Sequence, residues 1–273
     1  MSELSLSHLT VLEVGPPDLI TLAAEAGFAA TGVRLVSPIP GGIEYPLRPG
    51  SPEMKETLRR MADLGVKVFD IEVVRLAPDT DVNAYAPIFE AGAELGAQRV
   101  CVNVDDADTA RTIDRFAALC DLAARWNLGV DIEFMIWRPV ARLADAAAIV
   151  TAAGKPNGGI LVDALHLSRS GGSPADVASL DPKLLGSVQL CDAPKKSPEP
   201  SGIIDEARGR RLPPGEGELP LRQLLDALPA GIPLAVEVPM TANAPALSPL
   251  QRARRVCQAT NALLRNWRAQ SGR

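Results

Sequence analysis

Short runs of aliphatic residues alternate with longer amphipathic segments along almost the entire chain. The apolar runs predict strands at residues 9–14, 31–36, 66–76, 98–104, 129–134, 159–163, 187–192 and 233–238. Apolar positions at helical spacing predict helices at residues 18–27, 51–65 and 84–96, in a segment ending near 127, and at 141–154, 219–228 and 248–267. The strands are rich in Val, Ile and Leu, which is typical of strands covered on both faces.

This alternation of strands and helices predicts a parallel α/β fold. Eight such units close naturally into a (β/α)8 TIM barrel, which we expect to occupy residues 1–273 as a single domain. A doubly wound open sheet is the alternative, but it usually carries a GxGxxG fingerprint after its first strand, and VGPPD stands there instead. Two stretches are expected to be loops: a Ser- and Gly-rich segment after residue 163, and the Pro-, Gly- and charge-rich residues 194–218.

Composition and charge narrow the class of protein. The chain is 47% hydrophobic with a net charge of −5, which is ordinary for a globular protein and gives no basic surface for nucleic acid. No apolar run approaches the roughly 20 residues needed to span a membrane, and the first residues do not resemble a signal peptide. The four cysteines form no CxxC pair, so we expect reduced thiols in a cytoplasmic protein, either monomeric or a homo-oligomer.

Polar residues occur near the ends of the last four predicted strands. Glu133, Asp163, Gln189 and Glu237 each stand at the position opposite in parity to the aliphatic residues of their own strand. In a closed barrel the aliphatic faces meet the helices, so these four side chains should face the axis at the carboxyl end, where barrel enzymes build their sites. A single acid near a strand end is usually a surface or capping group, whereas four in register favour a shared role.

Three carboxylates and an amide oxygen placed together would repel one another without a cation. An all-oxygen ligand set suits Mg²⁺ or Mn²⁺ better than Zn²⁺. We therefore predict one divalent metal ion held by Glu133, Asp163, Gln189 and Glu237.

Five further residues are candidates for substrate binding: His166 and Trp137 just after two of these strands, Glu72 and Arg34 near the ends of the third and second strands, and Arg211 in the long loop. A guanidinium at Arg211 could hold a hydroxyl, carboxylate or phosphate, although an exposed loop arginine is the simpler interpretation. Trp137 could stack on a sugar face or only roof the pocket. His166 could meet the substrate or serve as a packed or capping histidine, and His8 is expected on the surface.

Several motifs together resemble those of the xylose-isomerase-like barrel superfamily, and in particular its bacterial sugar phosphate isomerase/epimerase group. The motifs are IEFMIW, VDALHLSRSGG, VQLCDAP, RRLPPGEGELPL and AVEVP. The resemblance covers nearly the whole chain and implies a barrel that holds one divalent metal. It also assigns Glu133, Asp163, Gln189 and Glu237 to the metal positions and His166 and Arg211 to substrate contacts.

Two departures from the family pattern bear on the substrate. Many of the epimerases carry His where this chain has Gln189, and their second glutamate, six residues after the first, is replaced here by Pro139. The second departure removes a sugar contact and makes a simple ketose 3-epimerase less favoured. The superfamily's endonuclease branch needs more metal-binding histidines than this chain, which has two.

The chemistry that these residues predict is proton transfer next to a carbonyl group of a sugar-like small molecule. The metal would stabilise an enediolate, Glu133 and Glu237 would remove and return the proton, and His166 would donate a hydrogen bond. Epimerisation, isomerisation and dehydration of an inosose- or 3-dehydroshikimate-like substrate all begin with this step. A barrel that binds a ligand without turnover is the remaining alternative.

Overall fold

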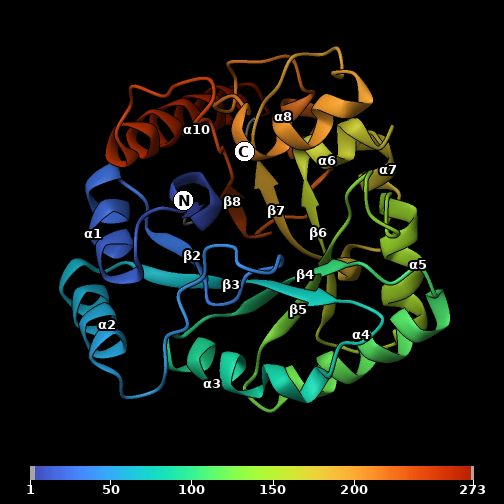
Figure 1. Cartoon of the computed structure of the whole chain (residues 1–273). Coiled ribbons are helices and arrows are strands. Elements are labelled where there is room, and N and C mark those ends of the chain that lie inside the picture. The colour runs from blue at the N-terminus through green and yellow to red at the C-terminus, as the bar shows by residue number, and fades with distance from the viewer. Residues whose placement is uncertain (1–3, 272–273) are drawn as a thin grey trace.

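The computed structural model describes residues 4–271 as a closed barrel of eight parallel strands inside a ring of helices (Figure 1). The predicted single-domain (β/α)8 barrel is therefore confirmed, although residues 1–3 and 272–273 lie outside the described residues. Strands pair in chain order, and β1 pairs with β8 to close the ring. Within residues 4–271 no helix combines the length and apolar character needed to cross a membrane.

The strands are β1 (Leu4–Leu6), β2 (Ala30–Arg34), β3 (Lys67–Leu76), β4 (Arg99–Val104), β5 (Gly129–Glu133), β6 (Gly158–Asp163), β7 (Leu185–Leu190) and β8 (Leu234–Val236). The α-helices are α1 (Pro16–Ala26), α2 (Pro52–Leu64), α3 (Ala86–Glu94), α4 (Thr109–Ala124), α5 (Leu143–Ala153), α6 (Ala164–Arg169), α7 (Pro174–Ala178), α8 (Ile203–Gly209), α9 (Leu221–Ala227) and α10 (Pro249–Ser271). Short 3₁₀ helices are η1 (His8–Val11), η2 (Val82–Tyr85), η3 (Pro182–Leu184) and η4 (Pro200–Gly202).

The main hydrophobic core lies between the strands and the surrounding helices. In β5 and just after it, Val130, Ile132 and Phe134 are fully buried in this core, so the intervening Glu133 faces the barrel interior. The same alternation operates in β4 and β6, where Cys101 and Leu161 point inward and form a small interior cluster with Val73. Because side chains alternate across each strand, the interior can be polar while the outer face remains aliphatic.

A polar plug closes the amino-terminal end of the barrel. Arg99, the first residue of β4, forms an ion pair with the buried Asp131, which also accepts a hydrogen bond of 2.8 Å from the Ser187 hydroxyl. Gly159 and Gly186 lie against this cluster, where an added Cβ would collide with Asp131 and Arg99. The glycines therefore make room for an ion pair that fills the barrel below the level of Glu133.

The predicted first strand at residues 9–14 is wrong. The structure places β1 at Leu4–Leu6 and a 3₁₀ helix at His8–Val11. The apolar character of this run arises because Val11 packs in the core and Leu9 and Leu12 line a cavity. His8, expected on the surface, is fully buried: its Nε2 lies 2.8 Å from the Val14 carbonyl oxygen, and its Nδ1 accepts from a backbone N–H 2.9 Å away.

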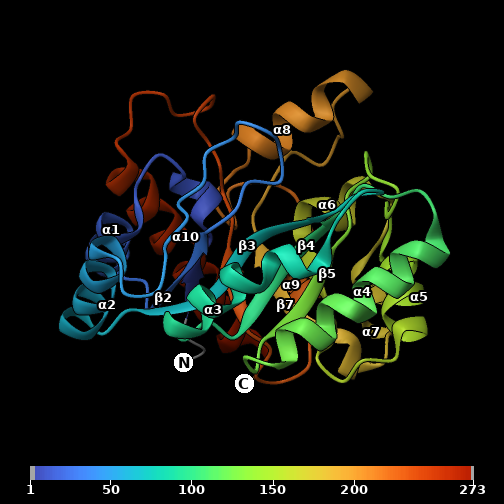
Figure 2. The same cartoon turned by 60° about the horizontal axis from the view of Figure 1, so that its bottom comes forward.

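Both predicted loops contain helices. Residues 194–218 include η4 and α8, and the Ser- and Gly-rich segment after residue 163 forms α6 and α7. Helix α7 begins with Pro174 after a capping box at Ser173, a turn-like sequence that also starts helices. Figure 2 shows α8 and the loop between β2 and α2 on the same side of the barrel, where they frame its open end.

Candidate active site

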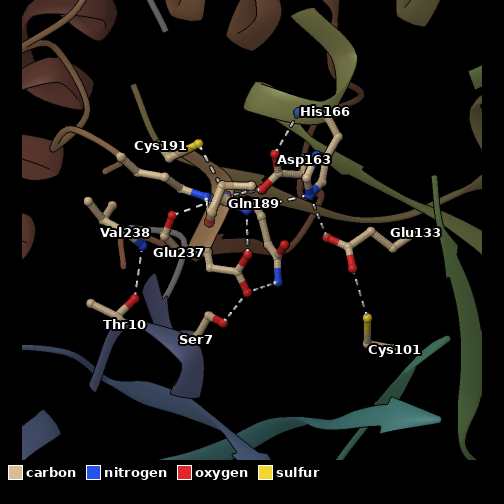
Figure 3. A network of polar contacts seen from close by, with 12 residues as sticks. Ser7, Thr10, Cys101, Glu133, Asp163, His166, Gln189, Cys191, Glu237 and Val238 are labelled. Atoms are coloured by element: carbon tan, nitrogen blue, oxygen red, sulfur yellow. Dashed lines mark hydrogen bonds and ion pairs between the residues drawn. The ribbon is translucent and has the colours of Figure 1, made fainter. Parts of the chain in front are cut away.

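The four predicted metal ligands lie together at the carboxyl ends of consecutive strands (Figure 3). Glu133 ends β5, Asp163 ends β6, Gln189 is the penultimate residue of β7, and Glu237 follows β8 directly. All four side chains are buried, and Asp163 is completely shielded from solvent. The parity argument from the sequence is confirmed, because each residue's neighbours along the strand pack in the outer core.

Arg211 lies at the centre of this group. Its Nη1 is 2.5 Å from Asp163 Oδ2, and its Nη2 is 3.0 Å from Glu237 Oε2. The side chain is only 1% exposed, and its Nε donates to the Ala207 carbonyl oxygen in α8. The interpretation of Arg211 as an exposed loop residue is therefore wrong: helix α8 and the chain after it carry the guanidinium into the barrel.

Glu133 and Glu237 have separate hydrogen-bond partners. The Glu133 carboxylate accepts from Asn103 Nδ2 at 3.0 Å and lies 3.7 Å from His166 Nε2. Glu237 Oε1 accepts from the Ser7 hydroxyl at 2.7 Å and from Gln189 at 3.2 Å. With Arg211 on its Oε2, Glu237 has partners on both oxygens, whereas Glu133 Oε1 has only His166 nearby among the described residues.

Burial and mutual repulsion raise the pKa values of both glutamates. Burial, together with the negative charges of Glu237 and Asp163, raises the pKa of Glu133 to about 8. Burial also raises the pKa of Glu237 to about 7, despite the opposing effect of Arg211. Burial acts to raise the pKa of Asp163, but Arg211 and His166 together outweigh it, so the pKa of Asp163 is lowered. Burial lowers the pKa of His166 to about 4, so this imidazole is neutral near pH 7.

The residues present fit a divalent cation. Ligand atoms of Glu133, Asp163 and His166 all lie within 4.8 Å of one another. The buried Gln189 Oε1 has no hydrogen-bond partner within the described residues, so this amide oxygen remains available to bind a cation. Two carboxyl groups with raised pKa values also indicate that Arg211 alone does not balance the negative charge. The described residues can therefore hold a metal ion, whose identity the donor set leaves open.

The five predicted substrate-binding residues all line one cavity that opens to solvent. Arg34 and Glu72 form a buried ion pair of 2.9 Å within it. Trp137 packs edge-to-face on His166 with ring centroids 5.1 Å apart. Glu133 and Glu237 also line the cavity, whereas Asp163 and Gln189 do not belong to its lining.

Two functional contacts escaped the sequence analysis. Asn103 has the inward parity within β4, opposite to Val102 and Val104, so its place beside Glu133 could have been predicted. Ser7 could not, because the first strand was misplaced and its partner Glu237 is 230 residues away.

The raised pKa of Glu133 makes a prediction about stability in the absence of metal. Between about pH 5 and pH 8 the folded protein holds a proton that the unfolded chain releases, so the free energy of unfolding should fall as pH rises. Glu133→Gln cannot titrate and should show a shallower fall. Urea unfolding of the metal-free protein across this pH range measures both slopes.

The exposed Glu216, which pairs with Arg255, provides the control for this measurement. Glu216→Gln should keep the wild-type slope. Identical slopes in the wild type and in Glu133→Gln would contradict a raised pKa at Glu133.

The chain matches the family model described as "Xylose isomerase-like TIM barrel" over residues 20–259. Its fold is similar to a structure of IolI protein with a bound zinc atom, at 16% identity and a TM-score of 0.77, covering 97% of this chain and 99% of that chain. It is also similar to the probable 3-DHS dehydratase AsbF from Bacillus anthracis, at 14% identity and a TM-score of 0.75, covering 95% and 98% of the two chains. A D-psicose 3-epimerase is similar at 15% identity and a TM-score of 0.70, covering 95% and 97%. No sequence match among curated proteins was found.

Proposed function

This chain belongs to the family of xylose isomerase-like TIM barrels, and on that premise we propose that it is a divalent-metal-dependent isomerase or epimerase. Its substrate is a sugar or a related polyhydroxy carbonyl compound, and the reaction begins with removal of a proton next to the carbonyl group. The observation that carries this proposal is the pair of glutamates, Glu133 and Glu237, which line one cavity. Glu133 also belongs, with Asp163 and His166, to a group whose ligand atoms could hold a metal ion. The four cysteines are all free and buried, in keeping with the cytoplasmic location that we also propose.

Glu133 and Glu237 are the groups that we assign to proton transfer. They enter the cavity from β5 and from the residue after β8, so they approach a bound substrate from different sides. One carboxylate removes a proton from the carbon beside the carbonyl, and the other carboxyl group returns a proton to the carbon skeleton. Return to the opposite face gives the epimer, and return to the neighbouring carbon interconverts aldose and ketose. Burial raises the pKa values of both groups in the metal-free protein, whereas a bound cation would lower them and make each carboxylate a weaker base.

Three other groups support this transfer. A divalent cation, Mn²⁺ or Mg²⁺, when held by Glu133, Asp163, Gln189 and Glu237, supplies Lewis-acid stabilisation of the negative charge that develops on the substrate. His166 is neutral and donates a hydrogen bond to a substrate oxygen. Arg211 keeps Asp163 ionised for ligation.

Hydrogen exchange in D₂O tests the proposal directly. The protein should be incubated with Mn²⁺ or Mg²⁺ and a panel of ketoses, and deuterium incorporation beside the carbonyl should be followed by NMR. Incorporation should require the metal, and Asp163→Ala should lower the bound metal content measured by elemental analysis. Exchange that persists in full after metal removal would contradict metal dependence, and an unchanged metal content in Asp163→Ala would remove that residue from the ligand set.

A metal-dependent dehydratase is the second candidate. It is favoured by Pro139, which stands where the family's ketose epimerases carry a second glutamate. Loss of a β-hydroxyl from the deprotonated substrate would produce an enone or aromatic product with strong ultraviolet absorbance. A barrel that only binds its ligand would show neither exchange nor such absorbance with any substrate in the panel.

A further inference from the structure

The mouth of the cavity carries positive charge that the protein itself does not balance. Arg75 and Arg138 both form ion pairs with one carboxylate, Asp105. Arg208, on helix α8, lines the same cavity and has no hydrogen-bond or ion-pair partner within residues 4–271. Two guanidinium groups therefore share one carboxylate, and the exposed Arg208 nearby has no ion-pair partner within the described residues.

Arg138 is held in this position with an unused donor. Its side chain is only 15% exposed, and its Nε is buried with no hydrogen-bond partner among the described residues. Burial and the positive charges of Arg208 and Arg75 lower the pKa of Arg138. A buried guanidinium that faces like charge indicates that an anion is missing from its surroundings.

The floor of the cavity has the opposite balance. There Arg34 pairs with Glu72, and Arg211 pairs with Asp163 and Glu237. Glu133 has only neutral partners, so carboxylates outnumber guanidinium groups at this level. The charges thus favour a cation at the floor, near Glu133, and an anion at the mouth, near Arg208. Arg138 follows Trp137 directly in the sequence, and both line the cavity.

We propose that the substrate carries an anionic group, a carboxylate or a phosphate, at the end away from its reacting carbonyl, and that Arg138 and Arg208 bind this group. The proposal rests on the proposed function, because it takes the reacting carbonyl to lie at the floor. Arg34 and Arg211 are not alternatives for this role, since each is paired with carboxylates at the floor. Arg138 instead shares Asp105 with Arg75 and has a buried Nε without a partner among the described residues. The anionic group would lie against Arg138 and Arg208, with the apolar side chains Met135 and Trp137 beside the carbon chain.

The test compares three matched probes: D-fructose, D-fructose 6-phosphate and 5-keto-D-gluconate. Binding is measured by isothermal titration calorimetry and turnover by deuterium exchange, each with the wild type, Arg208→Met, Arg138→Met and Arg138→Lys. At least one anionic probe should bind about tenfold to a hundredfold more tightly than D-fructose, the range expected for charge-assisted hydrogen bonds. Arg208→Met and Arg138→Met should lower the binding of the anionic probe toward that of D-fructose, and Arg138→Lys should retain part of the preference. The stronger of the two anionic probes identifies the group.

Arg210→Met is the matched control, because Arg210 is exposed, pairs with Asp205 and does not line the cavity. It should bind every probe as the wild type does. Arg208 has no partner to lose, so its variant remains informative if Arg138→Met fails to fold. Equal binding of the charged and neutral probes by the wild type, or an anion preference that both methionine variants retain, would overturn the anion site.

Failure of the proposed function gives a different result. If no probe exchanges deuterium but the anionic probe still binds through Arg138 and Arg208, the anion site stands and the isomerase proposal falls. If D-fructose exchanges as fast as both anionic probes and binds as well, the isomerase proposal stands and the anion site falls.

Discussion

Replacing Glu237 with glutamine should lower the rate of carbon–hydrogen exchange by about 10²- to 10⁴-fold, the usual contribution of a general acid or base. Glutamine has nearly the same shape and can still accept the Ser7 hydrogen bond, but it can neither take up nor release a proton. Because the pKa of Glu237 is already raised by burial, loss of its charge should leave the fold intact. Exchange in D₂O and circular dichroism of the same sample measure the two effects separately.

Glu216→Gln serves again as the control, since Glu216 forms an exposed ion pair with Arg255. It should exchange at the wild-type rate. Full activity in Glu237→Gln would remove Glu237 from the proton transfer and leave Glu133 to be tested in the same way.

Replacing Arg211 with methionine should destabilise the metal-free protein by about 3–5 kcal/mol, the cost of removing one partner from a buried ion pair. Asp163 and Glu237 would lose the one guanidinium partner that they have within residues 4–271, while remaining buried. Urea unfolding near pH 7 measures the loss, and Arg211→Lys should recover part of it. Because a divalent cation can neutralise the same carboxylates, added Mn²⁺ should stabilise Arg211→Met more than it stabilises the wild type.

The contrast for this experiment is Arg255→Met, which breaks a surface ion pair and should cost less than about 1 kcal/mol. An unfolding midpoint unchanged by Arg211→Met would mean that Arg211 does not balance the buried carboxylates in solution.

The barrel and the direction of its polar residues could be predicted from the sequence because both follow from local periodicity. Val130, Ile132 and Phe134 alternate with Glu133, and strand geometry turns this alternation into an inner and an outer face. The first strand was missed because Leu4–Leu6 is too short to give a clear pattern, whereas the longer run beside it is apolar for another reason.

The position of Arg211 could not be predicted in this way. Its partner Asp163 is 48 residues distant in the sequence. The Arg211 side chain enters the barrel only because helix α8 forms within a segment that is rich in Pro and Gly. Sequence identified the residue as a candidate, but its burial depends on tertiary packing that no local pattern encodes. The unmatched charge at Arg138 and Arg208 was missed for the same reason, since it becomes visible only when their neighbours are known.

The plug formed by Arg99, Asp131 and Ser187 has a consequence for molecular traffic. Together with the apolar cluster of Val73, Cys101 and Leu161, it fills the barrel interior below Glu133, so the cavity does not continue through the barrel. Substrate and product therefore use the same end of the barrel, and product must leave before a new substrate molecule can bind. Product that accumulates would bind again and compete with substrate for the same site. Net turnover therefore depends on how quickly a later reaction removes the product.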